Sequence, residues 1–164
     1  MDLYLIRHAT AEDRNPVVWP DDSRRPLTKK GIRRFKRAAK GLVSLIPEVD
    51  ILLASPYERA WHTALLLEEA GWPSPLRLDE LTQGEPGVLL RVLLRYQDVE
   101  SVALAGHEPH LSRFATALLG GNAAPWGEMK KGGVARLELA HLSFTTAARL
   151  RWYLPPSVAG KLDG

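Results

Sequence analysis

The chain has 164 residues, which is enough for one domain with a single buried core but too few for two domains of ordinary size. Hydrophobic residues make up 45% and charged residues 25% of the sequence, with a formal net charge of +3, and this balance excludes disordered and fibrous proteins. The absence of cysteine excludes disulfides, thiolate metal sites and cysteine nucleophiles and fits a reducing compartment such as the cytoplasm, and neither a signal peptide nor a membrane-spanning run is indicated.

The first predicted element is a short buried strand over residues 3–6. It ends abruptly at Arg7 and His8, two side chains that favour water or an anion. Residues 9–27 follow and are rich in Asp, Arg, Asn and Pro, so we expect a loop that passes over the end of this strand.

The next predicted element is an amphipathic helix over residues 28–46. Thr28 is a suitable cap, Pro47 follows the last turn, and apolar residues recur at steps of three and four at Ile32, Phe35, Ala39, Leu42 and Ile46. Between Ser23 and Pro47 the sequence has nine Arg or Lys residues and no acid. This basic face is either solvated or a surface for an acidic partner protein, and nucleic acid is disfavoured because no aromatic residues are interleaved with the charges.

Strands and helices alternate through the rest of the chain. We expect strands over residues 50–54, 76–78 and 101–105, helices over 57–70 and 109–119, a helical face over 89–94, and two further strands over 134–139 and 143–153. The pattern predicts one α/β domain over residues 1–154, with a mainly parallel central sheet flanked by helices on both faces, and a loosely ordered tail over residues 155–164.

Polar side chains follow the ends of two predicted strands. Arg7 and His8 follow the first strand, and His107 follows the strand over residues 101–105. Ligands of such sheets bind beyond the carboxyl ends of the strands. Together with Arg59, these residues would supply two guanidinium groups for phosphate oxygens and a neutral imidazole to attack phosphorus, which points to phosphoryl transfer through a phosphohistidine.

Three motifs carry a family resemblance. The stretches L-I-R-H-A, S-P-Y-E-R-A-W-H-T-A and A-G-H-E-P occur in this order and resemble the motifs of the histidine phosphatase superfamily. The R-H-A-x-A pattern, the R-P-L-T-x-x-G stretch and the short length are similar to the SixA-like phosphohistidine phosphatases. The resemblance spans about residues 3–140 and implies a phosphoglycerate mutase-like fold.

The resemblance also implies roles for single residues. His8 would be the nucleophile, and Arg7, Arg59 and His107 would be catalytic residues that also bind the phosphate of the substrate. Ala9 stands where the superfamily usually has Gly, a form that is familiar in the SixA-like branch.

The general acid is less well defined. Glu80 follows the strand over residues 76–78 in the expected order, although the local pattern of the larger phosphomonoesterases is missing; the competing candidates are Glu108, Glu12 and Asp13. A weakly placed acid favours phosphohistidine as substrate, because its leaving imidazole can be protonated before the P–N bond breaks. The spacing of the motifs also leaves no insertion large enough for a lid, which suits a phosphorylated protein surface.

Other readings of the same residues are less favoured. A metal site built from His8, His107, Glu108 and His110 would place a cation beside two arginines, so we expect no metal and no cofactor. We expect His62, His110 and His141 to be structural. Lys130 and Lys131, in the K-K-G-G turn, are candidates to reach toward the pocket, which their position in the sequence alone does not decide.

The expected function is therefore a metal-independent phosphatase. Its partner would be a phosphorylated substrate, with a phosphohistidine protein as first choice, and we expect neither nucleic acid nor membrane as a partner. The alternatives are a phosphatase of a small phosphate ester or of polyphosphate, and a non-catalytic phosphate-binding module. The last is disfavoured because binding alone would not require the His8 nucleophile.

Overall fold

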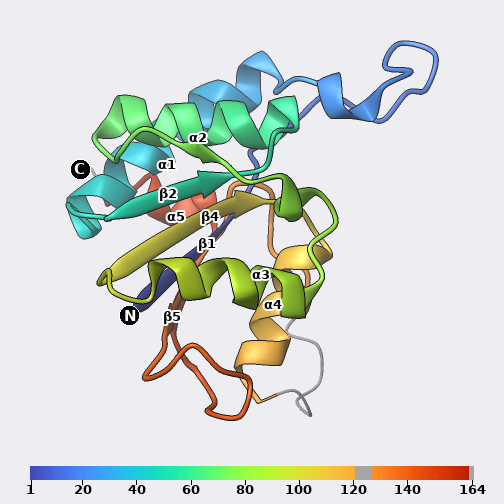
Figure 1. Ribbon diagram of the computed structural model, residues 1–164. Helices are drawn as coiled ribbons and strands as arrows, with labels where there is room; N and C mark the ends of the chain where they lie inside the picture. The colour runs from blue at the N-terminus through green and yellow to red at the C-terminus, as the bar shows by residue number, and fades with distance from the viewer. Residues whose placement is uncertain (121–126, 163–164) are drawn as a thin grey trace.

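The computed structural model describes residues 1–120 and 127–162 (Figure 1). Six strands form one sheet in the order β3-β2-β4-β1-β5-β6. The strands are β1 (Asp2–Arg7), β2 (Ile51–Ala54), β3 (Leu76–Arg77), β4 (Ser101–Gly106), β5 (Val134–Glu138) and β6 (Arg149–Leu154). β1, β2, β3 and β4 are parallel, and β5 is antiparallel to both of its neighbours. The predicted α/β class with a mainly parallel sheet is confirmed.

Helices cover both faces of this sheet. The α-helices are α1 (Lys29–Leu45), α2 (Glu58–Ala70), α3 (Pro86–Leu93), α4 (His110–Leu118) and α5 (Pro156–Ala159), and the 3-10 turns are η1 (Asp22–Arg24), η2 (Asp79–Thr82) and η3 (Leu94–Tyr96). α1, α2 and α5 lie on one face and α3 and α4 on the other (Figure 1). No helix in these described ranges is long and apolar enough to cross a membrane.

The sequence of β1 explains how one strand serves two cores. Successive side chains of a strand point to opposite faces. Tyr4 and Ile6 accordingly join the core under α1 and α2, whereas Leu3 and Leu5 join the core under α3 and α4. Because apolar groups are needed on both faces, the strand reads as a continuous hydrophobic run.

Helix α1 begins and ends as its sequence predicts. The Thr28 hydroxyl accepts a hydrogen bond from the backbone N–H of Gly31 at 2.8 Å, which satisfies one free donor of the first turn. The buried stripe of the helix includes Phe35, Ala39 and Leu42. The cationic residues of α1 therefore lie on its solvent side.

Two predictions at the end of the chain are wrong. The strand expected over residues 143–153 begins only at Arg149, because Ser143 and Thr145 hydrogen-bond to each other in an exposed turn, with 2.7 Å between their hydroxyl oxygens. Within the tail expected to be loosely ordered over residues 155–164, Pro156–Ala159 instead form α5, whose Ala159 is fully buried, and residues 163–164 lie outside the described part of the chain. Gly41 of α1 permits this packing, since a Cβ atom there would lie 2.0 Å from the Ala159 carbonyl oxygen.

The strand register brings three strand ends together at one edge of the sheet. Arg7 of β1 pairs with Gly106 of β4, and Ala54 of β2 pairs with Ala105 of the same strand. The residues that follow these pairs are His8, His107 and Ser55. Parallel pairing therefore places two imidazoles and a hydroxyl side by side, although they are far apart in the sequence.

Candidate active site

His8 is held by its backbone and by its ring. Its N–H donates to the Gly106 carbonyl at 3.0 Å, and its own carbonyl accepts from the Gly132 N–H at 2.9 Å. The ring Nδ1 lies 2.7 Å from the Ala9 carbonyl oxygen. Because a carbonyl can only accept, Nδ1 carries the proton, and the opposite nitrogen, Nε2, keeps its lone pair.

The His8 ring is also electrically neutral. The side chain is 6% exposed, and this burial, reinforced by the charges of Arg59 and Arg7, lowers the pKa of His8 to about 3. At neutral pH the ring therefore has an unprotonated nitrogen available to attack an electrophile.

His107 lies beside His8, with 5.3 Å between the ring centroids. Its Nε2 is 2.9 Å from the hydroxyl oxygen of Ser55, which is fully buried and also accepts the Tyr57 N–H at 3.4 Å. Because Nε2 is the only acceptor that the described residues offer to the Ser55 hydroxyl hydrogen, we assign Ser55 as the donor to Nε2, and the proton of the ring then lies on Nδ1. His107 Nδ1 is buried and has no hydrogen-bond partner among the described residues.

His107 is neutral for the same reasons as His8. Burial, followed by the charge of Arg59, lowers the pKa of His107 to about 2. The ring is thus an N–H donor that adds no positive charge to the site.

Arg59 extends from the first turn of α2 and is held in place by Asp22 of η1. Its Nη1 donates to the Asp22 carbonyl at 2.8 Å, and its Nη2 lies 3.1 Å from the Asp22 carboxylate. Its guanidinium also lies over the Tyr57 ring at 5.1 Å from the centroid. The remaining donor, Nε, is buried and has no partner in the described part of the chain.

Asp22 links two arginines in the loop that follows β1. Its carboxylate accepts from Arg25 Nε at 2.8 Å on one side and pairs with Arg59 on the other. Partial burial opposes its ionisation, but the Arg25 hydrogen bond and the Arg59 charge together lower the pKa of the Asp22 carboxyl. The loop thus supplies a fixed anion behind Arg59.

Arg7 is fixed from the opposite side of the site. Its Nη1 donates to the Met129 carbonyl and lies 2.7 Å from the Glu128 carboxylate. Glu128 is 67% exposed, so water and salt screen this ion pair strongly. As in Arg59, the Nε of Arg7 is buried and has no partner among residues 1–120 and 127–162.

One hydroxyl connects the two sides of the site. Thr63 of α2 is fully buried, accepts the Ala9 N–H at 3.0 Å and donates to the Arg59 carbonyl at 2.6 Å. The residue after His8 and the helix that presents Arg59 are therefore joined through a single side chain.

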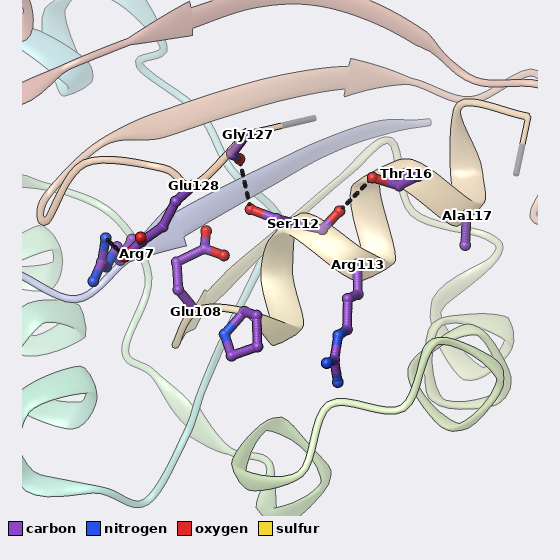
Figure 2. A pocket seen from close by; sticks show the side chains of 9 residues that line it. Arg7, Glu108, Ser112, Arg113, Thr116, Ala117, Gly127 and Glu128 are labelled. Carbon is purple, nitrogen blue, oxygen red and sulfur yellow. Dashed lines mark hydrogen bonds and ion pairs between the residues drawn. The ribbon is translucent and has the colours of Figure 1, made fainter. Parts of the chain in front are cut away.

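A groove of about 650 Å³ opens beside Arg7 (Figure 2). One wall is α4, and the other is the segment of Gly127 and Glu128; the Ser112 hydroxyl donates to the Gly127 carbonyl at 3.0 Å across it. Glu108 lies at the end of the groove near Arg7, where its carboxylate accepts the Met129 N–H at 3.3 Å. The groove provides room for atoms of a substrate beyond a phosphoryl group.

The structure brings together four of the residues that the sequence singled out: Arg7, His8, Arg59 and His107. Glu80 lies in η2 and is half-buried, and its carboxylate makes no hydrogen bond or ion pair within the described ranges. The competing acids Glu12 and Asp13 are exposed in the loop after β1. No group of three His, Asp or Glu side chains in the described chain is arranged to hold a metal ion.

Sequence reasoning missed the residues that position these four. Ser55 opens the S-P-Y-E-R-A-W-H-T-A stretch, so its place in the sequence marked it, but its contact with His107 depends on the register of β2 and β4. Asp22 has no signal of its own within a polar loop. Glu128 and Met129 lie more than 120 residues from Arg7 in the sequence, and no local pattern links them.

Known proteins are similar to this chain in sequence and in fold. The family model of the histidine phosphatase superfamily (branch 1) matches residues 3–84. An uncharacterised protein of Picosynechococcus sp. (strain PCC 7002) is 35% identical over 141 residues, which cover 84% of each chain.

Solved structures agree with the family model. The protein histidine phosphatase SixA, solved in complex with tungstate, is 25% identical, with a TM-score of 0.81 over 96% of this chain and 98% of the other. A phosphohistidine phosphatase SixA assigned in Agrobacterium tumefaciens is also 25% identical, with a TM-score of 0.77 over 94% and 98% of the two chains. With the family model, the sequence relative and the shared fold in agreement, the chain belongs to branch 1 of the histidine phosphatase superfamily.

Proposed function

We propose that this phosphatase hydrolyses phosphohistidine in proteins through a covalent phosphoenzyme on His8. The observation that carries the proposal is the neutral His8 ring beside three buried N–H groups that lack partners in the described chain: Arg7 Nε, Arg59 Nε and His107 Nδ1. Buried donors of this kind cost free energy unless a ligand accepts from them. A phosphoryl group offers three oxygens for these donors.

The reaction has two steps. In the first, the Nε2 lone pair of His8 attacks phosphorus and the P–Nε2 bond forms, while the P–N bond to the substrate imidazole breaks with its electron pair going to that imidazole, which takes a proton from the proposed acid Glu80. In the second, water attacks phosphorus and gives a proton back to Glu80, the P–Nε2 bond breaks with its electron pair returning to His8, and phosphate leaves. The donors from Arg7, Arg59 and His107 stabilise the charge of the phosphoryl oxygens, a contribution that typically amounts to about 3 kcal/mol for one donor.

Two observations favour phosphohistidine over a small phosphate ester as the substrate. SixA, which is similar over nearly the whole chain, is a protein histidine phosphatase and binds tungstate, a tetrahedral oxyanion like phosphate. The groove beside Arg7 is open, as suits a side chain presented by a protein surface. An alpha-ribazole-5'-P phosphatase assigned in Escherichia coli shares the fold at 19% identity, which carries no inference on substrate.

We keep Glu80 as the proposed general acid, on the resemblance of its position after β3. An imidazole leaving group takes up a proton readily, so the step requires little from this carboxyl. Cleavage of an alkyl phosphate would require more. We therefore propose that Glu80 contributes less to turnover than any of the other four residues.

The deciding experiment is a rapid quench during turnover of a protein chemically phosphorylated on histidine. Wild-type enzyme should carry phosphate that is labile in acid and stable in base, on the peptide that contains His8. His8→Ala should form no phosphoenzyme and lose several orders of magnitude in rate, whereas the exposed His141→Ala serves as the matched control and should behave as wild type. Comparable turnover by His8→Ala, without any phosphoenzyme, would favour direct attack by water.

A substrate panel separates the classes of substrate. The phosphohistidine protein should be hydrolysed with a higher kcat/KM than sugar phosphates, nucleotides or polyphosphate. A preference for any of these would move the function to a small phosphate ester or to polyphosphate. Binding of phosphate without turnover of any substrate would favour the non-catalytic module.

A further inference from the structure

The two edges of α1 have different surroundings. On the edge near α2, Lys36 pairs with Glu69 at 2.7 Å. On the edge near α5, Arg34 and Arg37 line a cavity of about 180 Å³ together with Lys161 and with Pro156, Ser157 and Gly160. Among the described residues, the lining of this cavity therefore has three cationic side chains and no acidic one.

The cationic lining continues toward the active site. Arg34 and Pro156 also line a small hollow whose other members include Ala9, Thr10 and Lys131. Lys131 precedes Gly132, whose N–H donates to the His8 carbonyl. We call Lys131, Arg34, Arg37 and Lys161 the basic track, because they line two hollows that share Arg34 and Pro156, one beside Ala9 and the other beside α5.

No ion pair among residues 1–120 and 127–162 neutralises the charges of the basic track. Of the seven cations on α1, only Lys36 forms an ion pair with a residue that the structure describes. The four residues of the basic track are all exposed. Like charges four residues apart on a helix repel each other, as do Lys30 and Arg34, so the isolated enzyme gains nothing from this arrangement.

We propose that the basic track binds an acidic segment of the phosphoprotein substrate while its phosphohistidine occupies the site at His8. The inference rests on the proposed function. Arginine side chains bind carboxylates through two parallel hydrogen bonds, and Arg34 and Arg37 provide two such groups one turn apart. From the first turn of α1 to Arg37 the helix rises about 10 Å, which an extended chain spans with about three residues.

A polypeptide is the occupant that the lining favours. Single-stranded nucleic acid is usually held by aromatic side chains on which bases stack. Among the described residues that line the two hollows, the only aromatic one is Phe35, which is buried in the core. Pro156, Ser157 and Gly160 complete the lining and carry small side chains or none, which leaves room for a polypeptide backbone beside the guanidinium groups.

The test uses two phosphohistidine peptides that differ only in one flanking segment, which is four Glu in one and four Gln in the other. The track variant is Arg34→Gln, Arg37→Gln and Lys161→Gln. The control variant removes the same number of charges from the other edge of the helix, with Lys29→Gln, Arg33→Gln and Lys40→Gln, which lie about a quarter of a turn away. The measured quantity is kcat/KM for each peptide at two concentrations of NaCl. The lower is about 20 mM, roughly one-seventh of physiological ionic strength, and the higher is about 500 mM, roughly three times that ionic strength.

Wild type should prefer the Glu peptide by about tenfold or more in low salt, and salt should remove most of this preference. The track variant should show no preference and should hydrolyse the Gln peptide and p-nitrophenyl phosphate at the wild-type rate. The control variant should keep most of the preference. Equal losses in the two variants would overturn the proposal, since only net charge would then matter.

The remaining outcomes separate this inference from the proposed function. If wild type hydrolyses both peptides equally well, the basic track does not bind acidic segments, although the proposed function stands. If wild type hydrolyses p-nitrophenyl phosphate but neither peptide, the proposed function fails as well. If duplex DNA inhibits wild type more strongly than the Glu peptide does, and the track variant escapes that inhibition, the occupant is nucleic acid and the proposal is overturned.

Discussion

The two buried histidines should make the protein lose stability in mild acid. In the unfolded chain, His8 and His107 titrate near their ordinary pKa of 6.5, whereas in the folded protein burial lowers the pKa values to about 3 and about 2. Above pH 6.5 both rings are neutral in both states. As the pH falls below 6.5, the unfolded chain binds protons that the folded protein does not, and the free energy of unfolding decreases.

The magnitude follows from these pKa values. At pH 5 both rings are still neutral in the folded protein, so each one contributes a loss of about 2 kcal/mol relative to pH 7. The two losses add, because neither ring is charged in the folded protein and the two do not repel each other. The pair should therefore cost about 4 kcal/mol, which is a large part of the stability of an ordinary domain.

The assay is urea unfolding at pH 7, 6 and 5. The free energy of unfolding of His8→Gln should fall by about 2 kcal/mol less than that of wild type between pH 7 and pH 5, since one titrating ring is missing. His141→Ala, which removes an exposed ring, should follow the wild-type curve. If His8→Gln and wild type lose stability in parallel, His8 titrates near its ordinary value and the account of a neutral nucleophile is wrong.

Three further predictions concern the chemistry of the site. Arg59→Lys keeps the charge but loses the planar fork held by Asp22, so kcat should fall by about 100-fold at saturating substrate while circular dichroism shows an intact fold; near-normal turnover would mean that Arg59 does not bind the phosphoryl oxygens. Ser55→Ala removes the hydroxyl that holds the proton of His107 on Nδ1, so kcat should fall by about tenfold with little change in KM, and ¹⁵N spectra of the ring should show a mixture of tautomers; a single unchanged tautomer would contradict the assignment. EDTA should leave the rate unchanged, because two guanidiniums and an imidazole N–H stabilise the phosphoryl charge; a loss that added metal restores would refute the role of the two arginines.

The sequence was informative wherever a local pattern has a physical cause. The stripe of α1 with its Thr28 cap predicted the helix, and the apolar runs of β1 and β4 predicted buried parallel strands. Parallel strands share their carboxyl edge, so the proximity of His8 and His107 could also be expected. The roles of Arg7, His8, Arg59, His107 and Glu80 stay predictions that the proposed experiments test.

Features that depend on packing between distant segments could not be predicted. Asp22 contacts Arg59 because η1 lies against α2, and α5 packs closely on α1 because Gly41 leaves room for the Ala159 carbonyl. In the sequence, the segment from Ser143 to Tyr153 alternates in the manner of a strand. At Ser143, however, side-chain hydrogen bonds compete with pairing in the sheet. The metal independence and the cytoplasmic location stay predictions.

The Thr63 hydroxyl makes the amide of Ala9 a natural reporter of the site. This amide, one residue after His8, can exchange its hydrogen with solvent only when the contact between β1 and α2 opens, since its acceptor is the same oxygen that binds the Arg59 carbonyl. A tetrahedral oxyanion held by both Arg7 and Arg59 would oppose that opening. The exchange rate of one backbone hydrogen therefore records occupancy of the site in an enzyme that carries no label and performs no turnover.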